Sequence, residues 1–249
     1  MKSINVIYED NHLLVVNKKA GLPTMGAESG PSLHSTACQY LREKYNKPGN
    51  AYLGIVSRLD SLTSGVIALA KTSKAAARLN QQFSRSSENA AVKTYLAITQ
   101  GNLPTGSSAT WTDHLIKDEA AHRMRITDHQ SDASKEGSLT WLSLHGQANW
   151  SLAAVRLHTG RKHQIRVQFS NRDHAVLGDK KYDATRKFDS GIALHSWHLS
   201  LFHPTRKEMM SFDAPPPKSW ESYLQQVPPS NHPDKNARLM KQIEDSLGH

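Results

Sequence analysis

Four sets of side chains in this sequence have the types and the spacing that chemistry requires. Each set places charged, aromatic or titratable groups within a few residues of one another. The sets are Arg58 with Asp60, Lys93 with Tyr95, Arg161 with His163 and Arg166, and His195 with His198. The first set holds the carboxylate that could act as a nucleophile or a general base.

Asp60 lies in a polar segment between two apolar runs, Gly54–Val56 and Val66–Ala70. Short apolar runs rich in β-branched residues predict strands, and Gly65 can take the positive φ that a tight connection needs. The Asp60 carboxylate and the Arg58 guanidinium would then lie at the mouth of a buried hairpin, and loops on rigid strands commonly carry chemistry. Taken alone, the segment leaves a plainer alternative open, in which Asp60 is a turn residue that bonds its own backbone.

A catalytic aspartate needs its ionised form held, and a buried arginine does this by charge and by hydrogen bonds that lower the carboxylate pKa. Arg166 is the candidate, because its neighbours Ile165 and Val167 indicate that the segment enters the interior. An arginine there requires a carboxylate partner. For Arg161 and Lys162, a solvated helix face or a contact with phosphate is favoured over catalysis.

Metal ligation is not expected. The pairs Glu119 with His122 and His195 with His198 are each three residues apart, but the second pair would face opposite sides of a strand. The single cysteine, Cys38, excludes a disulfide framework and a cysteine-rich zinc site. Cys38 lies in an apparent helix and is expected to be a packed core thiol rather than a nucleophile. The chain also lacks a glycine-rich phosphate loop, a Ser-His-Asp elbow and a dinucleotide fingerprint.

The composition bounds the class of protein. With 249 residues, 37% of them hydrophobic and 21% charged, one large or two small soluble globular domains are expected. No apolar run approaches the roughly 20 residues of a membrane span, and the N-terminus does not resemble a signal peptide, so the cytoplasm is the expected location. The net charge of +9 favours polyanionic partners, although many basic proteins bind none.

Apolar patterning predicts more strands than helices. The strands are expected at Ile4–Tyr8, Leu13–Asn17, Gly54–Val56, Val66–Ala70, Val92–Thr99, Trp111–Leu115, Met124–Ile126, Leu139–Leu144, Trp150–Leu157, Ile192–Phe202 and Met209–Phe212. Helices are expected at Leu33–Tyr45, at Lys74–Ser84 with Thr72 or Ser73 as cap, from Thr159–Gly160 to Phe169, at Trp220–Gln226 and within Ala237–Leu247. Loops are expected at Gly26–Ser32, Lys47–Asn50 and Ser84–Asn89. Most links between strands are too short for a crossover helix, which favours an α+β domain with a mixed, mostly antiparallel sheet flanked by helices over a doubly wound fold.

Several blocks of sequence occur in an order typical of one family. They are Val6–Asp10 with Leu14–Lys18 and Gly21–Pro23, then Arg58–Asp60 with Thr63–Gly65, Lys93–Tyr95, Leu157–Val167, Gly178–Asp179 with Tyr182, Ala193–His195 and Phe202–Pro204. In these blocks, over roughly Asn5 to Trp220, the chain resembles the RluA-type RNA pseudouridine synthases. It departs from the family pattern at three positions, with Ser57 in place of a usual histidine, Lys162 in place of a common threonine and Gln168 in place of a common histidine.

The resemblance implies conversion of uridine to pseudouridine within a structured RNA, ribosomal or transfer, with no cofactor and no metal. Asp60 would be the catalytic carboxylate, as nucleophile or base, and Arg166 would pair with it. Tyr95 would stack on the flipped base and Ile165 would pack against that base. Arg58 would fill the gap left in the RNA stack or brace its own loop.

The remaining expectations concern organisation and alternatives. Lys93 and Arg161 are expected to contact RNA. Residues 1–227 are expected to form a single catalytic domain and 228–249 a tail, with no separate N-terminal RNA-binding domain, and a monomer is the default. The main alternative is a non-catalytic RNA-binding protein on the same core. A glycoside hydrolase is a further alternative, but a second acid is not apparent.

Overall fold

The computed structural model describes residues 4–26, 30–46, 48–49, 51–84, 89–128, 130–233 and 236–246. The chain divides into two compact units, of which the first holds Met1–Lys93 and Ser196–Pro216 and the second holds Thr94–His195 and Pro217–His249. The loops predicted at Gly26–Ser32, Lys47–Asn50 and Ser84–Asn89 lie partly outside the described residues.

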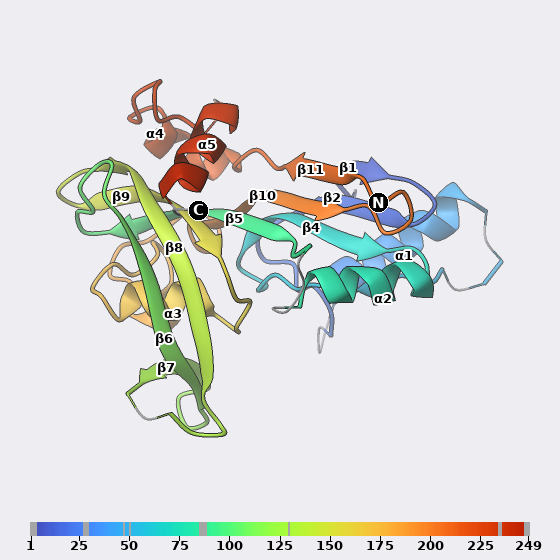
Figure 1. The fold of residues 1–249 in the computed structure, drawn as a ribbon, viewed down its shortest axis with the longest axis horizontal. Coiled ribbons are helices and arrows are strands. Elements are labelled where there is room, and N and C mark those ends of the chain that lie inside the picture. The colour runs from blue at the N-terminus through green and yellow to red at the C-terminus, as the bar shows by residue number, and fades with distance from the viewer. Residues whose placement is uncertain are drawn as a thin grey trace. The chain divides into compact units, whose positions relative to one another are not determined.

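The first unit is built on strands in the order β1-β2-β4-β10 (Figure 1). Their bounds are β1 (Val6–Glu9), β2 (Leu13–Lys18), β4 (Ser64–Ala70) and β10 (Leu194–Phe202), with β3 (Gly54–Ile55) paired to β4 and β11 (Met209–Asp213) paired to β10. The pairs β1–β2, β2–β4, β3–β4 and β10–β11 are antiparallel. All seven residues of β4 are buried, which explains why its sequence is a continuous apolar run rather than an alternating one.

Two helices complete the first unit at the predicted positions. Helix α1 (Leu33–Lys44) starts with a capping box, in which the Ser32 side chain accepts from Ser35 N and the Ser35 side chain accepts from Ser32 N. Helix α2 (Ser73–Gln82) is capped by Thr72, whose hydroxyl accepts from Ala75 N. Figure 1 shows α2 alongside β4, and the buried side chains of α2 share one core cluster with those of β2, β4 and β10.

The second unit holds strands in the order β5-β9-β8-β6-β7. Their bounds are β5 (Val92–Gln100), which belongs to this unit from Thr94 onward, β6 (Ser108–Asp118), β7 (Arg123–Thr127), β8 (Lys135–Gly146) and β9 (Trp150–Leu157). Its helical segments are α3 (Gln164–Ser170), η1 (Lys180–Tyr182), η2 (Lys218–Trp220), α4 (Glu221–Leu224) and α5 (Asn236–Ser246). The pairs β6–β7, β6–β8 and β8–β9 are antiparallel, and Figure 1 shows β6 and β8 running side by side as long strands.

The predicted α+β fold with a mostly antiparallel sheet is confirmed, and a few bounds were wrong. The third predicted helix begins at Gln164 and not at Thr159–Gly160. The short strands predicted at Trp111–Leu115 and Met124–Ile126 are parts of the longer β6 and β7. The boundary between a 1–227 domain and a 228–249 tail stays a prediction.

The C-terminal segment is helical, as the sequence indicated, from Asn236 to Ser246, and Leu247 lies outside the described residues. Leu239 and Ile243 are buried, and α5 packs against β8. No helix in the described ranges combines the length and the apolar character that crossing a membrane would require.

Gly65 shows why the entry to β4 tolerates no side chain. Its φ is +116°, and a Cβ built on it would lie 2.1 Å from the backbone oxygen of Ser196 on β10. The Ser196 hydroxyl also donates to Val66 O at 3.0 Å. The close approach of the two backbones therefore requires glycine at this position.

We expect Gly65→Ala to lower the free energy of unfolding by roughly 3 kcal/mol or more, because the new methyl group meets backbone in a left-handed conformation. Gly30→Ala is the matched control, since Gly30 has φ +97° but no atom within 4 Å of the added Cβ, and it should cost about 1 kcal/mol. Chemical denaturation of both variants measures the difference. Equal losses would show that backbone conformation alone, and not the contact with Ser196, sets the requirement.

Candidate active site

The loop that carries Asp60 is tied to the segment after β2 on both sides of the aspartate. The Thr24 hydroxyl donates to Leu59 O at 2.8 Å and accepts from Leu59 N at 3.2 Å. Gly21 N donates to Ser61 O at 2.8 Å, and Thr63 N donates to Asp60 O at 3.1 Å. The backbone at Asp60 is thus fixed through both of its neighbours, and these ties do not involve the side chain of Ser57.

Lys18 adds a charged tie to the same loop. Only 1% of Lys18 is exposed, and its ammonium donates to Leu22 O at 2.8 Å, to Lys19 O at 3.1 Å and to Ser61 O at 3.2 Å. Burial lowers the pKa of Lys18 to about 8, and attraction to the Asp60 carboxylate acts in the opposite direction. The buried Lys18 ammonium is therefore bonded to the residue that follows Asp60 and is attracted by the Asp60 carboxylate.

The other predicted residues of the first unit are placed differently. Arg58 is exposed and Asp60 is half-buried on the same loop, which suits a guanidinium that reaches outward beside a sheltered carboxylate. Lys93, near the start of β5, is half-buried, with its Nζ 5.9 Å from the centroid of the Phe83 ring. Burial lowers the pKa of Lys93. The Lys93 ammonium thus already interacts with a side chain of the protein, the Phe83 ring.

In the second unit, Arg166 enters the interior from α3, as the sequence indicated. Arg166 is 3% exposed, and its guanidinium makes two hydrogen bonds to Asp179, from Nε to Oδ2 at 2.6 Å and from Nη2 to Oδ1 at 2.8 Å. Its Cζ also lies 4.9 Å from the centroid of the Tyr182 ring. The expected carboxylate partner is confirmed and is Asp179. The predicted ion pair of Arg166 with Asp60 joins residues of different units and stays a prediction.

The Tyr182 hydroxyl ties three segments of the second unit together. It accepts a hydrogen bond from Met124 N of β7 at 3.0 Å and is 2.8 Å from Nδ1 of His163. The rings of His163 and Tyr182 also meet edge to face, with centroids 5.5 Å apart. Tyr182 therefore fixes both the approach to α3 and the face on which the Arg166 guanidinium rests.

The late start of α3 has a local cause. His163, the residue before the helix, has a φ of 54° and so interrupts helical geometry. The Gln164 side chain occupies the preceding turn, where its Oε1 accepts from the Thr159 hydroxyl at 2.7 Å and from Arg161 N at 3.0 Å. These bonds hold Thr159 and Arg161 in a loop rather than a first helical turn.

The remaining predicted residues of this unit are Tyr95, Ile165 and Arg161. Tyr95 on β5 is 8% exposed and Ile165 on α3 is 3% exposed. Arg161 is half-buried and donates from Nε to Glu136 O at 2.8 Å. The interpretation of Arg161 as part of a solvated helix face was wrong, because it precedes the helix and is held by β8. No contact given by the structure tests the catalytic or RNA-binding roles of these residues.

Sequence reasoning gave no role to Lys18, Asp179 or Tyr182, although all three lie in the blocks shared with the family. A signal was present for Lys18, because it follows the wholly apolar run Leu13–Val16 and so continues a buried strand. The partnership of Asp179 with Arg166 links the residue before η1 to helix α3 and carried no local signal.

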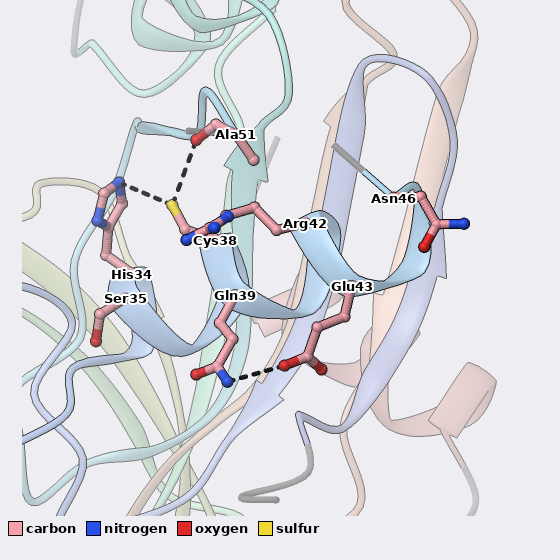
Figure 2. Close-up of a pocket in the computed structure, with 8 residues that line it drawn as sticks. All are labelled: His34, Ser35, Cys38, Gln39, Arg42, Glu43, Asn46 and Ala51. Carbon is pink, nitrogen blue, oxygen red and sulfur yellow. Dashed lines mark hydrogen bonds between the residues drawn. The ribbon is translucent and has the colours of Figure 1, made fainter. Parts of the chain in front are cut away.

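A separate pocket of about 740 Å³ lies on α1. Figure 2 shows the Cys38 sulfur between the His34 ring and the Ala51 carbonyl, at 3.7 Å from Nε2 and 3.5 Å from the oxygen. Cys38 thus lines a pocket instead of filling a core. Burial raises its pKa, which keeps the thiol protonated and agrees with the expectation that it is not a nucleophile.

Within the described ranges, no group of three or more histidine, cysteine, aspartate or glutamate side chains could hold a metal ion. The charged groups described above are Asp60 with Lys18 in the first unit, and Arg166 with Asp179 and the Tyr182 ring in the second.

Comparison with known proteins decides the family. The family model described as RNA pseudouridylate synthase matches residues 12–171. This chain belongs to the RluA-type RNA pseudouridine synthases. It is 30% identical over 240 residues to the ribosomal large subunit pseudouridine synthase D of Zymomonas mobilis, covering 92% of this chain and 74% of that protein. It is 27% identical over 241 residues to the tRNA pseudouridine synthase C of Yersinia pestis, covering 90% of each chain.

A solved structure shows the same fold in another family member. The human RNA pseudouridylate synthase domain containing 4 superposes with a TM-score of 0.72 at 23% identity, over 89% of this chain and 92% of that one. This structure confirms the fold that the sequence implied. The family match and the 30% identical relative confirm the enzyme class, so this protein is a pseudouridine synthase enzyme.

In this synthase, we expect Asp179→Asn to lower the free energy of unfolding by about 3 kcal/mol, because it removes the negative charge that accepts hydrogen bonds from Nε and Nη2 of the buried Arg166. Asp113→Asn is the matched control. Asp113 also makes two hydrogen bonds to an arginine, Arg172, but that pair is 29% and 12% exposed against 4% and 1% for Arg166 and Asp179. The control should cost about 1 kcal/mol. Urea denaturation compares the two, and equal costs would contradict the importance of burial.

The depressed pKa of Lys18 gives this synthase a pH-dependent stability. The folded state binds fewer protons at this site than the unfolded state between pH about 8 and 10.5, so stability rises with pH across that window. The cost of burying the ammonium is fully present below pH 8.

Relative to Lys18→Met, the wild type should gain about 3 kcal/mol in unfolding free energy over this range. Denaturation of both proteins at several pH values measures this difference. A difference that does not change with pH would show that Lys18 titrates normally when folded.

Proposed function

We propose that this synthase isomerises a uridine in a structured ribosomal or transfer RNA, with Asp60 as the catalytic carboxylate. The N1–C1′ bond breaks, the base rotates and the C5–C1′ bond forms, while C5 loses a proton and N1 gains one, so the atoms balance and no cofactor is needed. The target base would be flipped out of the RNA stack at a cost of a few kcal/mol.

The observation that carries the proposal is the fixed position of Asp60 beside a buried ammonium. Both flanking residues, Leu59 and Ser61, are held by hydrogen bonds to the segment after β2. The Lys18 ammonium bonds to Ser61 O and is attracted by the Asp60 carboxylate. A carboxylate fixed in place is ready to act at the sugar or the base without reorganisation.

Other residues have supporting roles in the proposal. In this proposal Arg166 pairs with Asp60, and Asp179 fixes the Arg166 guanidinium. Tyr95 stacks on the flipped base and Ile165 packs against it. The exposed Arg58 occupies the space that the base leaves.

Lys93 and Arg161 contact the RNA in this proposal with the parts of their side chains not engaged by Phe83 and Glu136. The choice of ribosomal or transfer RNA is supported by the names of two relatives, one a ribosomal and one a tRNA synthase. Mapping pseudouridine in total RNA from cells with and without the gene identifies the substrate.

We expect Asp60→Asn to lower the rate of C5 hydrogen release from [5-³H]uridine RNA by at least ~10³-fold, because the reaction loses its ionised carboxylate. RNA affinity should stay within about threefold, since Asp60 does not contribute a phosphate contact. Glu43→Gln, which removes one exposed carboxylate of α1, is the matched control and should keep the wild-type rate. Turnover by Asp60→Asn at the control rate would refute the role of Asp60.

A further inference from the structure

Three segments of the second unit meet at the Tyr182 hydroxyl, and each one carries cations. Met124 of β7 and His163 of the loop before α3 both contact this oxygen, and Tyr182 itself ends η1. Residues within three positions of these contacts must lie near one another. The segments 123–127, 161–166 and 179–183 all fall within that range.

The three segments have a large excess of positive charge. Their cationic residues are Arg123, Arg125, Arg161, Lys162, Arg166, Lys180 and Lys181, and their acidic residues are Asp179 and Asp183. Asp179 is bound by Arg166, and Asp183 is bound by Arg123 at 2.9 Å. Both carboxylates are thus neutralised within the set, and seven cations less two acids leaves a formal charge of +5.

The backbone geometry presents this charge to solvent. On β7, Met124 and Ile126 pack against the cluster of Leu115, Val167 and Tyr182. Alternation therefore places the exposed Arg125 on the same side of β7 as Arg123, which bonds to Lys181 and Asp183. Lys162, Lys180 and Lys181 are also exposed.

Arg123 secures the spacing of these segments. Its Nη1 donates to Lys181 O at 3.1 Å as well as to Asp183, so β7 is bonded directly to η1. The four exposed cations are therefore held on a rigid frame rather than on independent loops.

We propose that Arg125, Lys162, Lys180 and Lys181, the Tyr182 surface, bind backbone phosphates of the substrate RNA beside the target uridine. The inference rests on the proposed function, because Arg166, which lies against the Tyr182 ring, is a residue of the proposed active site. Exposed lysine and arginine tips on a fixed frame complement a chain of phosphates, and such contacts position RNA without reading its sequence. The Tyr182 surface thus sets affinity and register, and the choice of uridine is made elsewhere.

The test compares two fourfold variants of equal charge. The first is Arg125→Gln/Lys162→Gln/Lys180→Gln/Lys181→Gln. The control is Arg42→Gln/Lys74→Gln/Lys207→Gln/Lys241→Gln, which changes exposed residues on α1, α2, the β10–β11 connection and α5. Both lower the net charge from +9 to +5.

Binding of end-labelled bulk transfer RNA is measured by fluorescence anisotropy from about 50 to about 200 mM KCl. The surface variant should bind at least ~10-fold more weakly at about 100 mM KCl, and its slope of log affinity against log salt should be smaller by about 3. The control should change the slope by less than about 1. The double variant Lys180→Gln/Lys181→Gln should give about half of the full effect, and thermal unfolding verifies that each variant is folded.

Equal slopes for the surface variant and the control would overturn the proposal, since net charge alone would then explain binding. An unchanged affinity of the surface variant would overturn it as well and would leave the surface to a different kind of partner. Turnover of the wild type is measured alongside. An inactive wild type would count against the proposed function, whereas an active wild type with an unchanged salt slope would count only against the Tyr182 surface.

Discussion

The buried ammonium of Lys18 is the constraint around which the first unit is organised. A charge in the interior is costly unless it is fully hydrogen-bonded and near an opposite charge. Here three carbonyl oxygens and the nearby Asp60 carboxylate meet that requirement. Two of those oxygens belong to the segment after β2 and one to the loop after β3. Satisfying the charge therefore forces the Asp60 loop into one position.

The second unit also buries a positive charge, that of Arg166, and compensates it with the carboxylate of Asp179. Arg166 is almost fully buried, as Lys18 is. Its charge is compensated by the Asp179 carboxylate, which accepts two hydrogen bonds, and by the face of the Tyr182 ring. The planar guanidinium suits this arrangement, because its donors point in fixed directions and can hold Asp179 while other donors serve the site. Each unit thus places one cation where chemistry is proposed and holds it with groups that cannot rearrange independently.

Local patterns in the sequence predicted most of this architecture. The strands and the two long helices of the first unit follow from apolar runs and from the caps at Ser32 and Thr72. The buried position of Arg166 followed from Ile165 and Val167. The start of α3 did not, because it depends on the Gln164 side chain filling the turn before it.

The contacts that hold the site residues in place could not be predicted from local sequence patterns either. Asp179 meets Arg166 only once the segment after α3 has folded back onto that helix, and Lys18 meets Ser61 across 43 positions of sequence. Such pairings depend on tertiary geometry, which neither periodicity nor capping encodes. The family resemblance located the blocks, but the structure supplied their partners.

The order of the strands in the first unit has a consequence for synthesis of the chain. β4 emerges from the ribosome long before its neighbour β10. The backbone of β10 is the one that Gly65 approaches closely in the folded protein. At elongation rates of roughly 5–20 residues per second, the interval between Ala70 and Ser196 lasts on the order of ten seconds. During that time the edge of β4 that will meet β10 is paired only with the two residues of β3, and the rest of that edge is open to pairing elsewhere.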